Sequence, residues 1–362
     1  MDDERKKKAL IICVDGIRPD ALLVADAPHT KRLVQGGSVS LIDDDSKKDK
    51  ALPCAYSFHA RCSGTPVSFP SWSSTLTGVP EELHSVRSND GAANFCDAPS
   101  VLAILQMALA DRQGMSYHIT EGESDEGLPL KTAAYLEGWY GIRNVLGGEG
   151  DTFLCEGDAE DVDQLCLFPD GHDEQATDAL CGALDAKKST DVVADVSVFY
   201  LHTADAAGHK HGFAPHIREY TDAIARVDKL VERAWNVVRE RRRKYKNEDW
   251  LVVMTTDHGG SARTCMPDCM KNRLDACIDA GYGQRACEGV HGLDSVLHKN
   301  IFFIVDAADK TIPGEIIPPP MNMDVTGTVL AHFGVNVDGA WCVCALRHVL
   351  HCESQGIKFE GV

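Results

Sequence analysis

Ala9–Asp15 reads Ala-Leu-Ile-Ile-Cys-Val-Asp, a run of six apolar residues that ends in a carboxylate. A short, continuous apolar run of this kind is typical of a strand buried on both faces of a parallel sheet. Three later runs share this character: Val196–Leu201, Leu251–Thr255 and Ile301–Val305. Helical patterns lie between the runs, at Ser100–Arg112, Asp173–Ala186 and Pro215–Arg242, where Pro215 suits a helix start. Strands that alternate with helices predict an α/β fold, which we expect to be a three-layer α/β/α architecture around a central, mostly parallel sheet.

Carboxylates follow three of the predicted strands. Asp15, Asp205 and Asp257 each come just after an apolar run. Ligands of such sheets bind outside the carboxyl ends of the strands, so we expect these three residues to converge on one edge. Three histidines accompany them in the sequence: His209, His258 and His291. Zinc and similar divalent metals bind mixed nitrogen and oxygen ligands, and a pair of ions about 4 Å apart can stabilise both ends of a phosphoryl transfer. The residue set therefore predicts a two-metal hydrolase.

The bulk composition limits the class of protein. The chain has 362 residues, of which 44% are hydrophobic, and contains no apolar run long enough to cross a membrane. Its formal net charge of -19 argues against a nucleic-acid duplex as the main partner, because duplex binding relies on basic patches. An acidic protein that hydrolyses phosphates needs strong local positive charge, which bound metal ions supply directly.

The N-terminal segment superficially resembles a secretion signal. Lys6-Lys7-Lys8 precede the apolar run, but that run has six residues, fewer than the roughly 7 to 15 of a signal peptide, and ends in Asp15. We interpret it as a buried strand with a charged lead-in. We therefore expect a cytoplasmic location, or a secreted one if a signal lying upstream has been removed.

The cysteines leave two interpretations open. The chain has 14 of them, and no two Cys-x2-Cys pairs stand at the separation of a zinc finger. Two groups are crowded, Cys265 to Cys287 and Cys342 to Cys352. Disulfides in an oxidising compartment and free thiols in a reducing one both fit these groups.

A candidate nucleophile lies between the first two predicted strands, within residues 64–78. Pro70 comes two residues after Ser68 and suits the first turn of a helix, whose N-terminal amides favour a phosphate or an oxyanion. A serine hydroxyl is a weak nucleophile at neutral pH, and metal coordination is one way to activate it. A serine before a helix is also a common N-cap, so Ser68 is interpreted together with the metal ligands.

Taken together, these motifs resemble the alkaline phosphatase superfamily, most closely its nucleotide pyrophosphatase/phosphodiesterase branch. The resemblance rests on Cys13–Asp20, on Ser68–Gly78, and on the order and spacing of the motifs at Asp205, Asp257 and His291. It covers nearly the whole chain and implies a single alkaline phosphatase-like catalytic domain over residues 9–350. Two segments, 121–172 and 259–290, are expected to be insertions that form surface loops or wall the substrate pocket.

The resemblance also implies roles for individual residues. One metal is expected on Asp15, Asp257 and His258, in contact with the Ser68 oxygen, and the other on Asp205, His209 and His291. Ser68 replaces the threonine that the family commonly uses as nucleophile, and Ser71 replaces an asparagine that is not a metal ligand. Asn89 matches an amide that donates to a phosphoryl oxygen, and Phe69 is expected to contact the substrate. The cofactors are two divalent ions, zinc by preference, with manganese or iron also fitting these ligands.

The predicted function is hydrolysis of phosphodiester or pyrophosphate bonds in a small phosphoester or nucleotide, through a phosphoserine intermediate. Two alternatives remain open: a phosphomonoesterase on the same site, or a non-catalytic module that binds metal and phosphate. A sulfatase is rejected because Ser-Gly-Thr-Pro follows Cys62, without the Cys-x-Pro-x-Arg pattern. Arg18 is expected to have a structural role. The histidines without a role in this scheme are expected to be packed or solvated: His29, His84, His202, His211 and His216.

Overall fold

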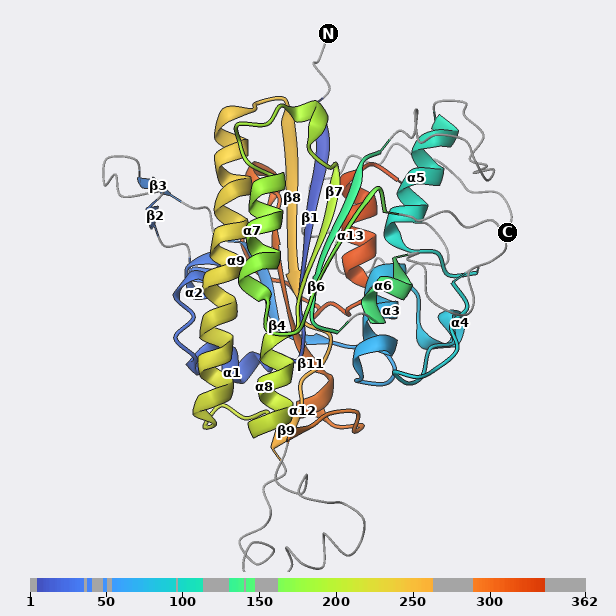
Figure 1. Cartoon of the computed structure of the whole chain (residues 1–362), viewed down its shortest axis with the longest axis vertical. Helices are drawn as coiled ribbons and strands as arrows, with labels where there is room; N and C mark the ends of the chain where they lie inside the picture. Colours follow the sequence, from blue (N-terminus) through green and yellow to red (C-terminus); the bar gives the residue numbers. More distant parts are fainter. Residues whose placement is uncertain are drawn as a thin grey trace, which may run out of the picture.

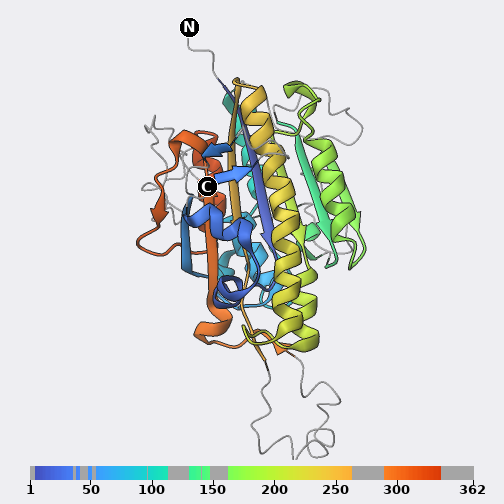
Figure 2. The ribbon, with the colours of Figure 1, turned by 90° about the vertical axis from the view of Figure 1, so that its left-hand side faces the viewer.

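The fold is that of a central sheet with helices on both faces (Figures 1 and 2). The computed structural model describes residues 5–35, 38–40, 48–50, 54–95, 97–112, 130–139, 141–146, 162–262 and 289–335. Within these residues the main sheet has eight strands in the order β12-β4-β11-β8-β1-β7-β5-β6. Their bounds are β1 Lys6–Val14, β4 Ala55–Arg61, β5 Thr132–Glu137, β6 Gln164–Phe168, β7 Val196–Leu201, β8 Glu248–Thr255, β11 Asn300–Asp306 and β12 Gly314–Glu315.

The sheet is mostly parallel, as predicted. Strands β6, β5, β7, β1 and β8 run in one direction, and β11 is antiparallel to both of its neighbours, β8 and β4. β1 lies in the interior, with Ile11 opposite Val198 of β7 and Val253 of β8. The three strands that precede Asp15, Asp205 and Asp257 are therefore adjacent, and their carboxyl ends lie together at the lower end of the sheet in Figure 1.

Helices cover the two faces of the sheet (Figure 1). One layer contains α1 Pro19–Val24, α2 Pro28–Gln35, α7 Asp173–Ala183 and α9 Arg218–Lys244, and the opposite layer contains α3 Ser68–Thr77, α5 Val101–Arg112, α6 Gly141–Val145 and α13 Asp324–His332. The lower end carries α8 Thr203–His211, α12 Val296–Lys299 and the two-stranded ribbon of β9 Ser261–Ala262 and β10 Gly289–Val290. The smaller elements are α4 Glu81–His84, the β2 Ser38–Ser40 and β3 Lys48–Lys50 pair, and the 3-10 turns η2 Thr190–Val192 and η5 Ala308–Lys310.

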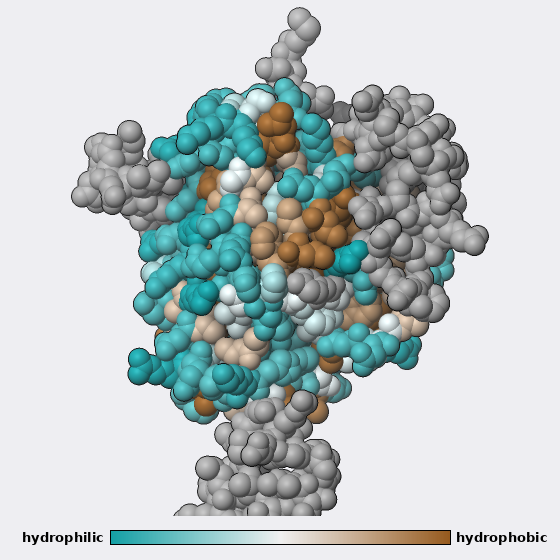
Figure 3. All heavy atoms as spheres, in the orientation of Figure 1, coloured by the Kyte–Doolittle hydropathy of each residue, from teal (hydrophilic) through white to brown (hydrophobic). Residues whose placement is uncertain are grey.

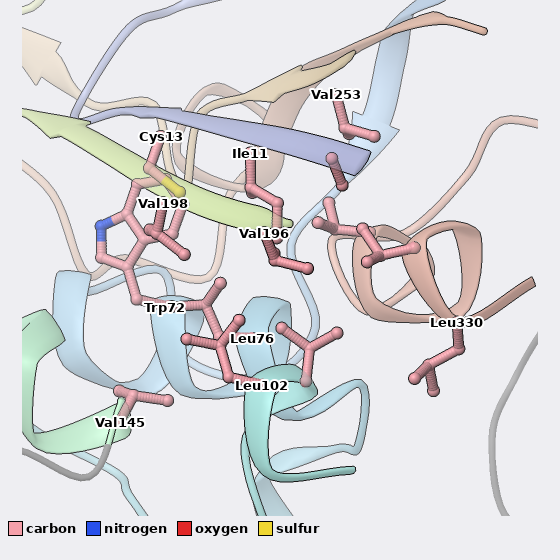
Figure 4. Packing of buried hydrophobic residues seen from close by; sticks show 14 of the residues in the cluster. Ile11, Cys13, Trp72, Leu76, Leu102, Val145, Val196, Val198, Val253 and Leu330 are labelled. Atoms are coloured by element: carbon pink, nitrogen blue, oxygen red, sulfur yellow. The ribbon is translucent and has the colours of Figure 1, made fainter. Parts of the chain in front are cut away.

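Burial on both faces explains the continuous apolar character of β1. Ile11 and Cys13 point into one core with Trp72 and Leu76 of α3 (Figure 4). Leu10, Ile12 and Val14 point into the other core, which includes residues of α9. Because successive strand residues face opposite sides, a strand covered on both sides has no polar face.

Three sequence expectations differ from the structure. α9 begins at Arg218 rather than at Pro215, which lies three residues before it. Residues 132–137 and 164–168 fall in the segment expected to be an insertion, but they form β5 and β6 of the main sheet. β5, with the sequence Thr-Ala-Ala-Tyr-Leu-Glu, has few branched residues, and β6 at the sheet edge is only partly buried, so neither gave a strong strand signal.

Parts of both expected insertions lie outside the described residues: 121–129, 140 and 147–161 of the segment 121–172, and 263–288 of the segment 259–290. Both crowded groups of cysteines lie outside them as well. The described cysteines Cys13, Cys54, Cys62, Cys166 and Cys181 are free thiols. In the described part of the chain, no helix combines the length and the apolar composition that crossing a membrane requires. Hydrophilic side chains cover much of the face shown in Figure 3, in keeping with the net charge of -19.

Candidate active site

The residues predicted as metal ligands converge at the carboxyl ends of β1, β7 and β8. Asp15 follows β1, and Asp257 and His258 follow β8. Asp205 lies in the first turn of α8, directly after β7, and His209 stands one turn later on the same helix. His291 follows β10, and the β9–β10 ribbon brings it to the cluster. Adjacent parallel strands thus bring together residues up to 276 positions apart, from Asp15 to His291.

Asp15, Asp257 and His258 form the first group of donor atoms. The Nε2 atom of His258 is 3.5 Å from Asp15 Oδ1 and 3.3 Å from Asp257 Oδ2, and all three side chains are fully buried. Ser68 Oγ is 3.2 Å from the same Nε2 atom. The predicted nucleophile therefore lies directly beside the predicted first metal site.

The second group is built around Asp205. His209 Nε2 is 3.2 Å from Asp205 Oδ2 and 3.0 Å from His291 Nε2. The rings of His291 and His258 are stacked with their centroids 3.9 Å apart, so His258 lies between the two groups. Ligand atoms of Asp205, His258 and His291 lie within 4.8 Å of one another, as do those of Asp15, Asp257 and His258.

The donor atoms fit a pair of divalent cations. Asp15 Oδ1, Asp205 Oδ1 and Asp257 Oδ2 are buried and accept no hydrogen bond. Leaving buried anionic oxygens without partners is costly, and a cation between them removes that cost. The separations of 3.2 to 3.5 Å around His258 Nε2 also match the edges of a tetrahedron with metal–ligand bonds of about 2.0 Å, which are about 3.3 Å.

The pKa shifts within the cluster also favour a bound cation. Burial, together with the charges of Asp15 and Asp205, holds the pKa of Asp257 well above its ordinary value. Burial and the charge of Asp205 likewise raise the pKa of Asp15. Burial alone would also raise the pKa of Asp205, but hydrogen bonds from His202 and His209 hold it well below the usual range. Three carboxylates at one point repel each other, and a cation among them favours their ionised forms.

Two aromatic side chains fix the orientation of Asp15. Trp72 Nε1 donates to Asp15 Oδ2 at 3.0 Å and the Tyr200 hydroxyl donates to the same oxygen at 2.6 Å. The two rings meet edge to face with centroids 5.8 Å apart. One oxygen of the carboxylate is thus occupied by two donors, while Oδ1 faces the cluster. Neither Trp72 nor Tyr200 was predicted from the sequence, although Tyr200 lies on a predicted strand.

Glycine is required next to Asp15. Gly16 has a φ of 65°, and a Cβ atom at this position would stand 2.8 Å from the Cβ of Asp205. Its backbone N–H donates to Asp257 Oδ1 at 3.1 Å. The chain therefore passes close to two of the three carboxylates at this turn.

The helix that carries Ser68 is anchored by a buried asparagine. α3 begins at Ser68, as the position of Pro70 predicted. Ser71, one turn into the helix, donates its hydroxyl to the backbone carbonyl of Asp257 at 2.6 Å. Asn322 Nδ2 donates to the carbonyl and the hydroxyl of Ser71, and Asn322 Oδ1 accepts from the backbone and the hydroxyl of Ser63. Asn322, which sequence reasoning missed, thus joins the nucleophile helix to the loop that leads into it.

Asn89 and Phe69 lie beside Ser68, the predicted nucleophile. Asn89 Oδ1 accepts the backbone N–H of Phe69 at 2.9 Å, which leaves the Nδ2 group of this exposed side chain as a donor. The ring of Phe69 contacts Phe95 and Trp139 edge to face, at centroid distances of 6.1 and 6.2 Å. An amide donor and an aromatic group therefore stand next to Ser68.

Arg18 has the structural role expected of it. Its Nη1 donates to the backbone carbonyls of Phe213 and Gly260, at 2.8 and 3.0 Å, and its other donors bind Asp20. Among the histidines without a predicted role, His29 and His84 are packed in the interior, His211 is partly exposed and His216 is exposed, as expected. His202 differs, because it contacts Asp205 directly.

A mostly parallel sheet, with a carboxylate and imidazole cluster at its carboxyl ends and a serine at a neighbouring helix N-terminus, defines an alkaline phosphatase-like hydrolase fold. Residues 151–298 match the family model of type I phosphodiesterases/nucleotide pyrophosphatases, a range that holds Asp205, His209, Asp257, His258 and His291. The resemblance expected from the motifs is thereby confirmed. Over this range the chain is similar to that family, and the match covers 148 of its 362 residues.

Solved structures show the same fold. An inactive variant of murine ectonucleotide pyrophosphatase/phosphodiesterase 5 in complex with AMP aligns with a TM-score of 0.57 at 13% identity, over 95% of this chain and 100% of that one. A second structure of the murine protein aligns with a TM-score of 0.54 at 13% identity, over 91% of this chain and 96% of that one. A Bacteroides thetaiotaomicron sulfatase from a locus for glycosaminoglycan metabolism aligns with a TM-score of 0.55 at 12% identity, over 91% of this chain and 73% of that one.

Proposed function

We propose that the protein hydrolyses phosphodiester or pyrophosphate bonds of a small phosphoester or nucleotide at a two-metal site, through a phosphoserine on Ser68. The observation that carries this proposal is the position of Ser68 Oγ, at the N-terminus of α3 and 3.2 Å from His258 Nε2. This atom is part of a cluster in which three buried carboxylates each have an oxygen without a partner. A serine hydroxyl next to such a cluster supports the proposal that Ser68 is the nucleophile.

The proposed ligands are those expected from the sequence. Asp15, Asp257 and His258 hold one ion next to Ser68, and the other ion is held by Asp205, His209 and His291. When bound, two divalent ions, preferably zinc because half of the ligands are histidines, activate the serine hydroxyl and stabilise the charge on the leaving oxygen. The three aspartates only partly neutralise two such ions, so the loaded site attracts an anionic phosphoryl group.

The chain's own residues then bind and orient the substrate. The Ser68 oxygen forms a bond to phosphorus while the bond to the leaving oxygen breaks on the opposite side. The Nδ2 group of Asn89 donates to a phosphoryl oxygen, and the amides of the first turn of α3 face the same charge. Water then cleaves the phosphoserine and restores the Ser68 hydroxyl. Phe69, with Phe95 and Trp139 behind it, offers an aromatic surface to the rest of the substrate.

Two observations favour a diester or pyrophosphate over the alternatives. A monoester carries an additional negative charge, and the guanidinium of Arg18 is already bound to two backbone carbonyls and to Asp20. The fold is shared with a sulfatase, but Ser68 faces the cluster, whereas Cys62 is buried six residues earlier. The AMP bound to the murine protein makes a nucleotide a suitable first substrate to test.

The experiment compares turnover of bis-p-nitrophenyl phosphate and p-nitrophenyl phosphate with zinc or manganese added. We expect a higher kcat/KM for the diester and loss of turnover in Ser68→Ala with metal content retained. After acid quenching of the diester reaction we expect one p-nitrophenylphosphoryl group on Ser68, because only one of the two p-nitrophenol groups leaves in the first step. Ser189→Ala, at an exposed serine ahead of η2, is the matched control. A preference for the monoester would move the protein to the phosphatase alternative. Full turnover in Ser68→Ala would refute the nucleophile, and metal binding without turnover of either substrate would favour the binding module.

A further inference from the structure

His202 connects Asp205 to the last residue of β5 and to a residue that follows β6. It lies between the end of β7 and the start of α8, and its Nε2 is 3.2 Å from Asp205 Oδ2. Its Nδ1 is 3.3 Å from Asp170 Oδ1, so each ring nitrogen faces a carboxylate oxygen. Its backbone N–H donates to Glu137 Oε2 at 2.9 Å. Side chain and main chain of one residue are therefore both fixed by acidic groups.

The neighbouring backbone prevents the ring from turning away. Gly138 has a φ of 82°, and a Cβ atom at this position would lie 2.6 Å from the His202 Cβ and 2.9 Å from its Nδ1. The main chain of Gly138 therefore packs directly on the imidazole. Glu137, which is fully buried, also accepts the backbone N–H of Gly171 at 2.7 Å. These contacts tie the ends of β5 and β6 to the residue that precedes α8.

The start of α8 is held from its other side as well. Thr203 Oγ1 donates to Asp173 Oδ2 at 3.0 Å, and Asp173 is ion-paired with Arg226 of α9. Asp205 is thus carried on a helix turn whose backbone is fixed, which leaves the rotation of its carboxylate as the main remaining freedom. The contact of His202 Nε2 with Oδ2, an oxygen that His209 Nε2 also approaches to 3.2 Å, restricts that rotation.

We propose that His202 is a positioning residue that orients the Asp205 carboxylate for the second metal ion, an inference that rests on the proposed two-metal site. His202 does for Asp205 what Trp72 and Tyr200 do for Asp15: each set of donors fixes one carboxylate. Groups that hydrogen-bond a metal ligand typically change metal affinity by about 10- to 100-fold when removed. Because Asp15 and Asp205 have separate hydrogen-bond donors, loss of His202 lowers the affinity for one ion and leaves the affinity for the other unchanged.

The test measures zinc binding directly. The full-length protein, freed of metal with a chelator, is dialysed against buffers of defined free Zn²⁺, and bound zinc is counted by mass spectrometry. We expect two binding steps in the wild type. In His202→Ala one step weakens by about 10- to 100-fold and the other is unchanged. His202→Gln, whose side-chain amide can donate to Asp205 Oδ2, is expected to recover part of the loss. His216→Ala, at an exposed histidine outside the cluster, is the control.

The outcomes separate this inference from the proposed function. A wild type that binds fewer than two zinc ions overturns the two-metal site itself. Two wild-type steps that are both unchanged in His202→Ala overturn the positioning role. Two steps that weaken equally, with a lowered melting temperature of the metal-free protein, show a general structural role instead and also overturn it. The glutamine variant provides the same comparison if His202→Ala does not fold.

Discussion

Tyr200→Phe removes one of the two hydrogen-bond donors to Asp15 and leaves the aromatic ring in place. The lost hydroxyl donates to Asp15 Oδ2 at 2.6 Å, while Trp72 Nε1 still donates to the same oxygen at 3.0 Å. The edge-to-face contact between the two rings, with centroids 5.8 Å apart, needs no hydroxyl and is retained. The substitution therefore tests the hydrogen bond separately from the packing.

The expected magnitude follows from the count of donors. A hydrogen bond to a charged group contributes about 1.5 to 3 kcal/mol, and one of two donors remains, so we take the lower value. About 1.4 kcal/mol corresponds to a tenfold change in Kd. We expect one zinc-binding step to weaken about tenfold, at the lower end of the range for groups that support a metal ligand.

The assay is the stepwise zinc titration, with Tyr56→Phe as control because Tyr56 is on β4 and its ring packs on Phe58. The step that weakens should differ from the step affected by His202→Ala. Unchanged or tighter zinc binding in Tyr200→Phe would falsify the reasoning. Tighter binding would mean that the basicity of Asp15 matters more than its orientation.

Two further predictions concern other positions. Gly16→Ala places a Cβ atom against Asp205, in a backbone conformation that alanine disfavours. We therefore expect kcat/KM to fall on the order of 100-fold in steady-state assays. The control is Gly182→Ala on α7, which has open space around it and should retain full activity. Burial raises the pKa of Asp324 to about 6, so the folded state binds a proton more tightly than the unfolded state and loses stability as the pH rises through about 6. Asp324→Asn should therefore raise the free energy of unfolding of the metal-free protein by about 1 to 3 kcal/mol at pH 8 and change it little at pH 4; urea denaturation that shows no gain at pH 8 would contradict this assignment.

Much of the cluster could be predicted because it depends on local patterns. Asp15 and Asp257 come directly after strong apolar runs, and parallel strands place such residues at one edge whatever lies between them. Asp205 could be predicted in the same way, and His209 stands four residues, or about one helical turn, after it. Ser68 could be placed because Pro70 marks the first turn of a helix. How the ligands divide between two ions stays a prediction.

The supporting residues could not be predicted because their roles depend on contacts between distant segments. Asn322 lies 251 residues from Ser71, and nothing in the sequence around either residue indicates their hydrogen bonds. Trp72 and Tyr200 read as core aromatics until Asp15 is placed between them. His202 was expected to be packed or solvated because no partner was assigned to it. One of its two carboxylate contacts, Asp170, follows β6, a strand that the sequence did not reveal.

The placement of β1 between β7 and β8 has a kinetic consequence. Amide protons in the middle of such a sheet exchange only when the whole domain opens, whereas short peripheral ribbons open locally and often. Asp15 and Asp257 follow the central strands closely, whereas His291 follows the peripheral β9–β10 ribbon, in whose described residues Gly289 pairs with Ala262 and Val290 with Ser261. The backbone that carries Asp15 and Asp257 is thus expected to open less often than the backbone that carries His291. In the proposed two-metal site, fraying of the ribbon would detach His291 from its ion without disturbing Asp15 or Asp257, so we expect the ion beside His291 to exchange faster than the ion beside Ser68.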